Sequence, residues 1–310
     1  MERCIRHIPV ETSRSSWLRA AAHKRRATDE AYSVRPRVGC MLPTNTNFDH
    51  IVEISQLCER LGYHSVWAFD HLAPYWLKSG ASLECWTTLA SLAPHTKDIK
   101  LGSLVTNVNL RHPSLLAKIT SSLDNITHGR VILGIGTGDM LSKRELTSFG
   151  YRYEPIDQRV TRLRETIQIL KGLWCSDDFS FVGKYFRLSH TNLEPKPTQH
   201  PHPPIWIGGK HHKVLDLVAE LADGWNYWNI NRKTLSSKTN YLRNKCSRMD
   251  RSFNHVTKSW SGTIPSCYST SELVDYLEGR SDAETRYFIG YFGRPTKLAL
   301  EEFSDAVSKL

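Results

Sequence analysis

The sequence contains no apolar run close to the roughly 20 residues that a bilayer-spanning helix needs. Its hydrophobic content of 40% is typical of a globular chain. The seven cysteines include no CxxC pair and have no metal-like spacing to histidines. We therefore expect a soluble, cytoplasmic protein with mostly buried, reduced thiols, no zinc site and no membrane partner.

Familiar catalytic signatures are also missing. The sequence has no GxSxG elbow, Walker loop, HExxH motif or kinase motif set, so acyl transfer, nucleoside triphosphate hydrolysis and metalloprotease chemistry have no support. A glycine-rich loop is present at Gly134–Asp139, but it departs from the dinucleotide fingerprint GxGxxG because Met140 and Leu141 follow.

Positive charge is in excess, and its distribution argues against nucleic-acid binding. The net charge is +10, and residues 1–37 hold nine basic residues against four acidic ones, so about half of the excess lies there. This segment lacks the apolar region of a secretory signal, its acidic residues argue against a transit peptide, and it lacks interleaved aromatic residues. We expect residues 1–36 to be a basic, disordered extension, and we expect no nucleic-acid partner.

From residue 37 to 310, short β-rich runs alternate with helical patterns, which indicates parallel strands joined by crossover helices. The pattern predicts a closed (β/α)8 TIM barrel; an open doubly wound sheet is the alternative. Strands are expected at 38–42, 65–69, 99–105, 131–135, 204–207, 224–228, 258–264 and 286–291. Helices are expected at 48–61, 84–93, 113–126, 157–174, 212–221, 233–249, 270–278 and from 295 to the C-terminus.

One stretch interrupts this alternation after the fourth βα unit. Residues 175–203 contain a hairpin-like segment at 179–188, followed by a loop rich in proline and histidine. Insertions of this length in compact domains often form lids or interfaces. We therefore expect an insertion into the barrel at about residues 175–203.

An ionisable pair, Asp70 and His71, directly follows the apolar strand SVWAF. Histidine exchanges protons near neutral pH, and an adjacent carboxylate can hold its tautomer or its charge. The pair could equally be an aspartate that caps the next turn beside a solvent-facing histidine. The following aromatic residues, Tyr75 and Trp76, could line a planar ligand or pack against the core.

The segment 101–138 is predicted to form a complete βαβ unit whose strand ends carry polar groups. Its first strand leads into Thr106, Asn107 and Asn109, and its second ends at the glycine-rich loop. In a parallel sheet, the carboxyl ends of the strands form the rim where ligands bind. The glycines there could allow close approach of a ligand, or they could form a purely structural turn.

A second glycine-rich strand end is IWIGG, which closes at Gly208 and Gly209 and is followed by Lys210 and a helix. Backbone amides, the positive end of the helix and the lysine could form a phosphate cradle; a short loop without a ligand is the alternative. The next strand opens at Asp223–Trp225, which could lie at the barrel bottom or at the edge of the same pocket.

Several linked segments, taken together, resemble the luciferase-like monooxygenase superfamily, which includes bacterial luciferase and deazaflavin-dependent oxidoreductases. The resemblance covers about residues 37–228 and is strongest to the coenzyme F420-dependent group. It is carried by ERLGYHSVWAFDHL, LECWTTLASLAPHTKDIKLGSLVTNVNLRHPSLLAK, SSLDNITHGRVILGIGTG, RVTRLRETIQILKGLW, EPKPTQHPHPPIWIGG and ADGW.

The resemblance implies a (β/α)8 barrel that binds F420 or FMN at its C-terminal mouth. It implies that His71 and Asp70 lie beside the reactive ring, with His71 in proton transfer, and that Tyr75 or Trp76 lines the substrate pocket. A non-prolyl cis peptide bond is implied at Ser103–Val105. The other cofactor-binding residues that it implies are Ser103, Leu104, Val105, Asn107, Thr137, Gly138, Asp139, Gly208, Gly209 and Lys210; Asp139 replaces a glutamate found in several F420 enzymes.

The resemblance therefore implies an F420-dependent oxidoreductase that transfers a hydride between the deazaflavin and a small organic substrate. An FMN-dependent monooxygenase that uses reduced flavin and O2 is an alternative, and a non-catalytic flavin-binding protein is another. A homodimer formed through barrel helices is also implied. The substrate is not identified by any motif; Lys210, Lys258 and Arg286 could meet an anionic group or be solvated surface residues.

Overall fold

The computed structural model describes residues 35–73, 82–265 and 267–310, apart from the side chain of Leu141. Arg35–Leu310 form one compact unit. Residues 1–34 of the predicted extension lie outside the described residues. Tyr75 and Trp76 also lie outside them.

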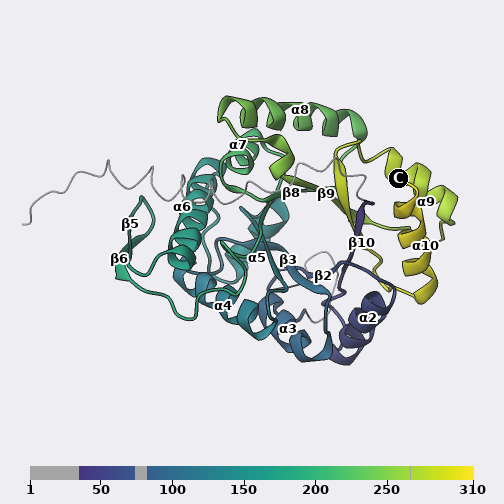
Figure 1. The fold of residues 1–310 in the computed structure, drawn as a ribbon, viewed down its shortest axis with the longest axis horizontal. Helices are drawn as coiled ribbons and strands as arrows, with labels where there is room; N and C mark the ends of the chain where they lie inside the picture. Colours follow the sequence, from purple (N-terminus) through teal and green to yellow (C-terminus); the bar gives the residue numbers. More distant parts are fainter. Residues whose placement is uncertain (1–34, 74–81, 266) are drawn as a thin grey trace, which may run out of the picture. The chain divides into compact units, whose positions relative to one another are not determined.

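Eight parallel strands close into a barrel in the order β1-β10-β9-β8-β7-β4-β3-β2 (Figure 1). This closure confirms the predicted (β/α)8 architecture and rules out an open doubly wound sheet. Each predicted strand is found within a few residues of its expected bounds. The strands are β1 (Arg37–Met41), β2 (Ser65–Ala68), β3 (Lys100–Asn107), β4 (Val131–Gly136), β7 (Ile205–Gly208), β8 (Gly224–Trp228), β9 (Thr257–Thr263) and β10 (Thr285–Tyr291).

Helices surround the strands, and local signals set several of their ends (Figure 1). Pro113 begins its helix at a position whose amide has no partner within the helix, and Gly62 follows the first helix with a φ of 75°. The helices are α2 (Phe48–Arg60), α3 (Cys85–Leu92), α4 (Pro113–Ile126), α5 (Met140–Ser148), α6 (Ile156–Cys175), α7 (His212–Leu221), α8 (Arg232–Arg248), α9 (Thr270–Glu278) and α10 (Lys297–Ser308).

Helix α5 was not predicted from the sequence. It follows β4 after a short loop, and Asp139 caps its start by accepting a hydrogen bond from the amide of Ser142 at 2.9 Å. Most of its described side chains are exposed, so it lacks the apolar periodicity by which amphipathic helices are recognised. The helix matters because it carries Glu145 to the carboxyl end of β2.

The expected excursion after the fourth barrel strand contains a two-stranded antiparallel sheet, β5 (Phe179–Val182) and β6 (Arg187–Thr191). The buried carboxylate of Glu165 on α6 anchors its turn. It accepts hydrogen bonds from the amides of Lys184 at 2.7 Å and Tyr185 at 2.9 Å. In Figure 1 the hairpin lies beside α6.

The barrel interior is filled by large side chains, so a ligand can reach the strands only from an end. The buried interior cluster comprises Met41, Trp67, Leu104, Ile132, Trp206, Tyr287 and Ile289. The rings of Trp67 and Trp206 lie 5.1 Å apart. Glycine is required opposite them, because a Cβ at Gly102 would lie 2.3 Å from Trp67 and one at Gly224 would lie 2.5 Å from Trp206.

Among the helices formed by the described residues, none has the length and apolar character needed to cross a bilayer. The same ranges hold no group of three or more histidine, cysteine, aspartate or glutamate side chains suited to a metal ion. Four of the cysteines in these ranges are buried, as expected for most of them, whereas two are exposed. Cys40, Cys58, Cys85 and Cys246 are buried, and Cys175 and Cys267 are exposed.

Candidate active site

His71 and Glu145 form a hydrogen-bonded pair at the carboxyl end of β2. The Nδ1 atom of His71 lies 2.8 Å from Oε2 of Glu145. The Glu145 carboxylate is buried, whereas the His71 side chain keeps 19% of its surface exposed. A neutral imidazole that donates from Nδ1 to a carboxylate carries its lone pair on Nε2, which is the atom that takes up a proton. The pair can therefore act as a general base whose tautomer is set by the glutamate.

The backbone after His71 holds Glu145 in place. Its Oε1 atom accepts hydrogen bonds from the amides of Leu72 and Ala73, the latter at 3.2 Å. Both carboxylate oxygens of Glu145 are thus occupied by the segment 71–73. Glu145 was not predicted as a site residue, because helix α5, which carries it, has no recognisable apolar pattern in the sequence.

Asp70 does not have the role expected from its place beside His71. Its buried carboxylate makes two hydrogen bonds with Arg111, at 2.7 and 2.9 Å, and accepts a third from the amide of Asn107 at 2.9 Å. It therefore connects the end of β2 to the loop after β3, while Glu145 orients the histidine. The prediction that Asp70 holds the tautomer of His71 is corrected accordingly.

Arg111 also contacts Glu84, the residue that caps α3. Burial opposes the charge of Arg111, but hydrogen bonding and attraction to Asp70 and the charge of Glu84 together raise its pKa above the usual value. Burial likewise disfavours the charged form of Glu84, yet amide hydrogen bonds and Arg111 lower its pKa overall. Both shifts favour the charged forms of Arg111 and Glu84.

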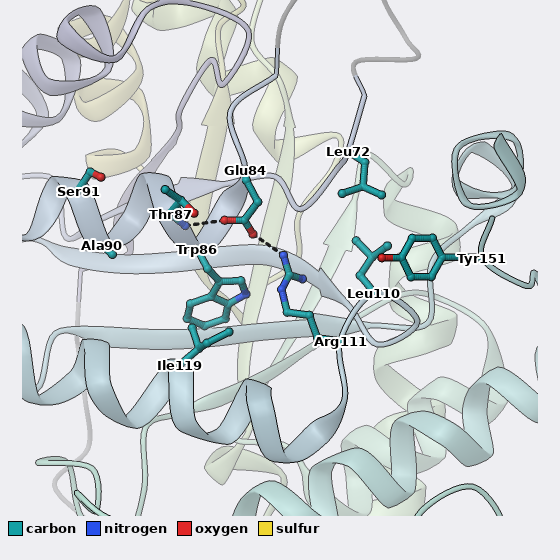
Figure 2. Close-up of a pocket in the computed structure, with 10 residues that line it drawn as sticks. All are labelled: Leu72, Glu84, Trp86, Thr87, Ala90, Ser91, Leu110, Arg111, Ile119 and Tyr151. Carbon is teal, nitrogen blue, oxygen red and sulfur yellow. Dashed lines mark hydrogen bonds and ion pairs between the residues drawn. The ribbon is translucent and has the colours of Figure 1, made fainter. Parts of the chain in front are cut away.

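This cluster borders a cavity of about 740 Å³ that is lined mainly by α3 and the loop before α4 (Figure 2). The guanidinium of Arg111 reaches the carboxylate of Glu84 in Figure 2, and Trp86 lines the same cavity. Neither His71 nor Glu145 lines it. We therefore place the reactive centre at the barrel mouth and treat this cavity as a neighbouring surface feature.

The cis peptide bond implied for β3 is present between Leu104 and Val105. Of the three residues expected to back the coenzyme, only Val105 is partly exposed. Ser103 is fully buried and donates to the carbonyl of Gly134 at 2.8 Å, and Leu104 belongs to the buried interior cluster. Direct coenzyme contact from Ser103 and Leu104 is thus not supported by this geometry, whereas Val105 is well placed for it.

Two glycines make room for Val105 at the mouth. A Cβ on Gly136 would lie 2.7 Å from its Cγ2 atom, and one on Gly208 would lie 2.8 Å from its Cγ1 atom. Because side chains at these positions would displace the valine, the two glycines and Val105 form one apolar surface. Gly208 was predicted to lie in a phosphate-binding region; a side chain at this position would meet Val105.

The loops after β3 and β4 meet through Asn107, Asn109 and Thr137. The Nδ2 atom of Asn109 donates to Oδ1 of Asn107 at 2.8 Å and to the carbonyl of Thr137 at 3.1 Å. Among the described residues, the buried Oδ1 atom of Asn109 has no hydrogen-bond partner. This orphaned acceptor at the rim fits a ligand that supplies a donor.

The β4 loop is supported from α6. Arg159 donates to the carbonyl of Thr137 at 3.1 Å and also to that of Gly138. Gly138 has a φ of 71°, and a Cβ there would lie 3.1 Å from Asn107, so the position favours glycine. The Asp139 carboxylate caps α5 by accepting a hydrogen bond from the amide of Ser142.

At the end of β7, the proposed phosphate cradle is only partly available. The amide of Gly209 donates to the carbonyl of Asn226 at 3.1 Å, and its own carbonyl accepts from the indole of Trp225 at 2.7 Å. Gly209 therefore cannot also donate to a phosphate, which corrects that part of the prediction. Lys210 is exposed beside it. Asp223 pairs with the start of β7 and so lies at the barrel bottom.

Aromatic side chains line the mouth on the side of β2, β8 and β10. The ring of Phe69 lies 5.6 Å from Tyr291 and 6.2 Å from each of Trp228 and His71. None of these three aromatic residues was predicted as a site residue. A usable signal was present, because Trp228 and Tyr291 end predicted strands whose carboxyl ends form the rim.

Comparison with known proteins shows similarity to one family over most of the chain. The model of the luciferase-like monooxygenase family matches residues 30–277. An F420-dependent hydroxymycolic acid dehydrogenase of Mycobacterium tuberculosis is 35% identical over 57% of this chain and 48% of its own length. An F420-dependent glucose-6-phosphate dehydrogenase of Amycolatopsis mediterranei is 29% identical over 56% of this chain and 52% of its own. The chain thus spans about half the length of these curated relatives.

Other comparisons include a flavin enzyme and solved structures of the same fold. An FMNH(2)-dependent dimethylsulfone monooxygenase of Pseudomonas putida is 36% identical over 38% of this chain and 32% of its own length. An F420-dependent secondary alcohol dehydrogenase in complex with an F420-acetone adduct superposes with a TM-score of 0.78 and 17% identity, covering 88% of this chain and 98% of that chain. At this identity the similarity shows the fold alone.

Proposed function

Because this chain belongs to the luciferase-like monooxygenase family, we propose that it is an F420-dependent oxidoreductase that transfers a hydride between the deazaflavin and a small organic substrate. The observation that carries the proposal is the His71–Glu145 pair, with its Nδ1–Oε2 distance of 2.8 Å. Curated relatives named as F420-dependent dehydrogenases support the choice of coenzyme.

The residues at the mouth fit a flat heterocycle. Val105 supplies a partly exposed apolar surface beside a cis peptide bond, and Gly136 and Gly208 leave the space that it needs. The orphaned acceptor on Asn109 can take a hydrogen bond from a ring or side-chain donor. A bound deazaflavin would supply the carbon that accepts or releases the hydride.

The protein's own contribution is to move one proton and to orient the reactants. In alcohol oxidation, Nε2 of His71 takes the hydroxyl proton of the substrate as the carbinol hydrogen leaves as a hydride; reduction of a carbonyl runs in the opposite sense. The Glu145 carboxylate stabilises the imidazolium that forms. Asp70 and Arg111 hold the β2 and β3 ends in register, so they are positioning residues.

Coenzyme titration tests this proposal. The purified protein is titrated with F420 and, separately, with FMN, and binding is followed by absorbance and fluorescence. We expect saturable F420 binding. We also expect His71→Ala to retain that binding and to lose about a hundredfold or more in turnover. His190→Ala, which changes an exposed histidine on β6, serves as the control. Unchanged turnover in His71→Ala would refute the assigned role.

The alternative coenzyme gives a distinct outcome. The similarity to an FMNH(2)-dependent monooxygenase makes reduced FMN the second candidate. Tight FMN binding without F420 binding, together with oxygen-dependent substrate turnover, would support a flavin monooxygenase. Binding of a coenzyme without any turnover would favour a non-catalytic flavin-binding protein.

We also propose that the protein works in the cytoplasm as a homodimer formed through barrel helices. Helix α4 exposes Leu115 and Ile126, whose exposed fractions are 54% and 62%. Exposed apolar side chains on a helix are suited to an interface. Light scattering after size-exclusion chromatography tests this prediction, since a purely monomeric mass at micromolar concentration would contradict it.

A further inference from the structure

The strands opposite the His71–Glu145 pair present a rim whose composition restricts the substrate. The register pairs Tyr291 with Thr263, and it pairs Ser261 with both Ile289 and Trp228. Ile289 belongs to the buried interior cluster, and paired residues of a sheet share a face. Trp228, Thr263 and Tyr291 are therefore the last inward-facing residues of β8, β9 and β10.

Two of these three positions are aromatic, and one of them is unusually open. Trp228 keeps 43% of its surface exposed, although it lies on an inward face. Its ring lies 6.2 Å from that of Phe69, which in turn lies 5.6 Å from Tyr291. A solvent-exposed indole within an aromatic cluster can bury a large apolar surface when an apolar molecule binds against it.

The basic residues of these strands lie at the other end of the barrel. Lys258 is at the start of β9, where it is 5% exposed, lies 3.7 Å from Glu284 and sits over the ring of Phe253. Arg286 is near the start of β10 and donates to the carbonyl of Ala283 at 2.5 Å. The possibility that either residue binds an anionic substrate group at the mouth is thus contradicted, and Lys258 is not a solvated surface lysine.

Arg280, which follows α9, makes contacts within the protein. The Nε atom of Arg280 lies 3.2 Å from Oδ1 of Asn229, and its guanidinium lies 3.7 Å from the centre of the Tyr276 ring. Within the described part of the chain, no inward-facing position at the carboxyl ends of β8, β9 and β10 carries a charge. An anionic group placed there would therefore find no charged partner on these three strand ends, while its apolar neighbours would displace part of its hydration.

Polar groups below the rim are also satisfied by one another. The Nδ2 atom of Asn226 donates to Oγ of Ser259 at 2.9 Å, and its Oδ1 accepts from Oγ of Ser261 at 2.9 Å. All three residues are buried. This network offers a substrate no unpaired polar side chain, so recognition depends on the aromatic rim above it.

We infer that the substrate is an uncharged alcohol or carbonyl compound with an apolar ring or chain beside the reacting carbon, and that Trp228 is a specificity-determining residue. This inference rests on the proposed function. In oxidation, the carbinol carbon gives its hydride to the deazaflavin, and the hydroxyl proton passes to Nε2 of His71, which leaves a carbonyl. The apolar group then lies against Trp228, Phe69 and Tyr291.

Matched substrate pairs test the inference. The F420-loaded enzyme is assayed with cyclohexanol and with 4-hydroxycyclohexanecarboxylate, and with 1-phenylethanol and its ring-carboxylated analogue, by following F420 absorbance. We expect kcat/KM for each neutral compound to exceed that of its charged partner by about a hundredfold. Trp228→Ala should raise KM for the neutral compounds about tenfold while leaving kcat and the F420 Kd within twofold. Met249→Ala, at another exposed apolar residue, is the control.

A second variant, Trp228→Arg, and a calorimetric measurement test the inference independently of Trp228→Ala. Trp228→Arg should lower the preference for the neutral compound at least tenfold. Equal or faster turnover of the charged compounds by the unmodified enzyme, or no KM change in Trp228→Ala, would overturn the inference while leaving the proposed function intact. Failure to bind F420 would instead contradict the proposed function.

Calorimetry of the coenzyme-free protein with cyclohexanone and 4-oxocyclohexanecarboxylate then tests the substrate class without the coenzyme. Stronger binding of the anion would contradict the inference.

Discussion

Glu145 binds His71 across 74 residues of sequence, with 2.8 Å between Oε2 and Nδ1. The contact forms because α5 returns from the end of β4 to the end of β2, and the amides of Leu72 and Ala73 hold the same carboxylate. The imidazole is thereby oriented by a buried acceptor while part of its surface remains open at the mouth. The following predictions test what this arrangement and its surroundings do.

Glu145→Gln should lower kcat about a hundredfold and leave the F420 Kd nearly unchanged. The amide keeps the shape of the side chain but removes the negative charge that stabilises the imidazolium and fixes its tautomer. Steady-state kinetics and coenzyme titration measure the two effects separately. The matched control is Glu53→Gln, which alters an exposed carboxylate 3.4 Å from His50. A parallel loss of coenzyme binding would indicate a structural role instead.

Asp70→Asn should destabilise the fold by about 3 kcal/mol, because it removes the partner of a buried guanidinium. Arg111 would keep only Glu84 as a charged partner, and the Asp70 side chain is 2% exposed. Denaturant unfolding measures the change. Glu220→Gln, which breaks a more exposed pair with Arg164, should cost less than about 1 kcal/mol. A stable Asp70→Asn protein without turnover would show that Asp70 is catalytic after all.

Gly208→Ala should weaken F420 binding about tenfold, because the new Cβ would lie 2.8 Å from Val105 and push the valine toward the coenzyme. Adding Val105→Ala removes both Cγ atoms and should restore much of the affinity. Gly279→Ala, whose Cβ would meet nothing closer than 3.6 Å, is the control. Fluorescence titration of the three variants provides the measurement. Failure of the double variant to recover would contradict a steric origin.

His64 at the barrel bottom should make the fold less stable in mild acid. Burial, followed by the charges of Arg37 and Lys100, lowers its pKa from 6.5 to about 4. Its Nδ1 lies 2.6 Å from the hydroxyl of Tyr287, and its Nε2 lies 3.2 Å from Arg37, which suits a neutral ring. Below pH 6.5 His64 is protonated in the unfolded chain, whereas in the folded protein it is protonated only below about pH 4. The free energy of unfolding therefore falls as the pH decreases from 6.5 to about 4.

His64→Phe should remove this part of the pH dependence. Between pH 7 and pH 4, the free energy of unfolding should fall less in the variant than in the unmodified protein. Because the ring is only partly buried, we expect this difference to be at most about 3 kcal/mol. Urea unfolding at several pH values measures the difference in slope. His50→Phe, at an exposed histidine, serves as the control. Equal slopes for the His64 variant and the unmodified protein would refute the prediction.

The sequence by itself determined the strands, most of the helices and the end of the barrel at which polar residues gather. These features depend on local periodicity, on Pro113 at a helix start and on Gly62 after a helix end. The residues 69–71 and 105 could be placed at the mouth for the same reason, since a strand and its end can be recognised from a few neighbouring residues.

Only the tertiary structure decided which side chains meet. Closure of the barrel brought Glu145 rather than Asp70 to His71 and directed the Gly209 amide to Asn226. Each of these contacts joins residues well separated in the chain, and each depends on how successive strands and helices are rotated about the barrel. That rotation cannot be predicted from local sequence, because it results from packing among elements that are distant in sequence.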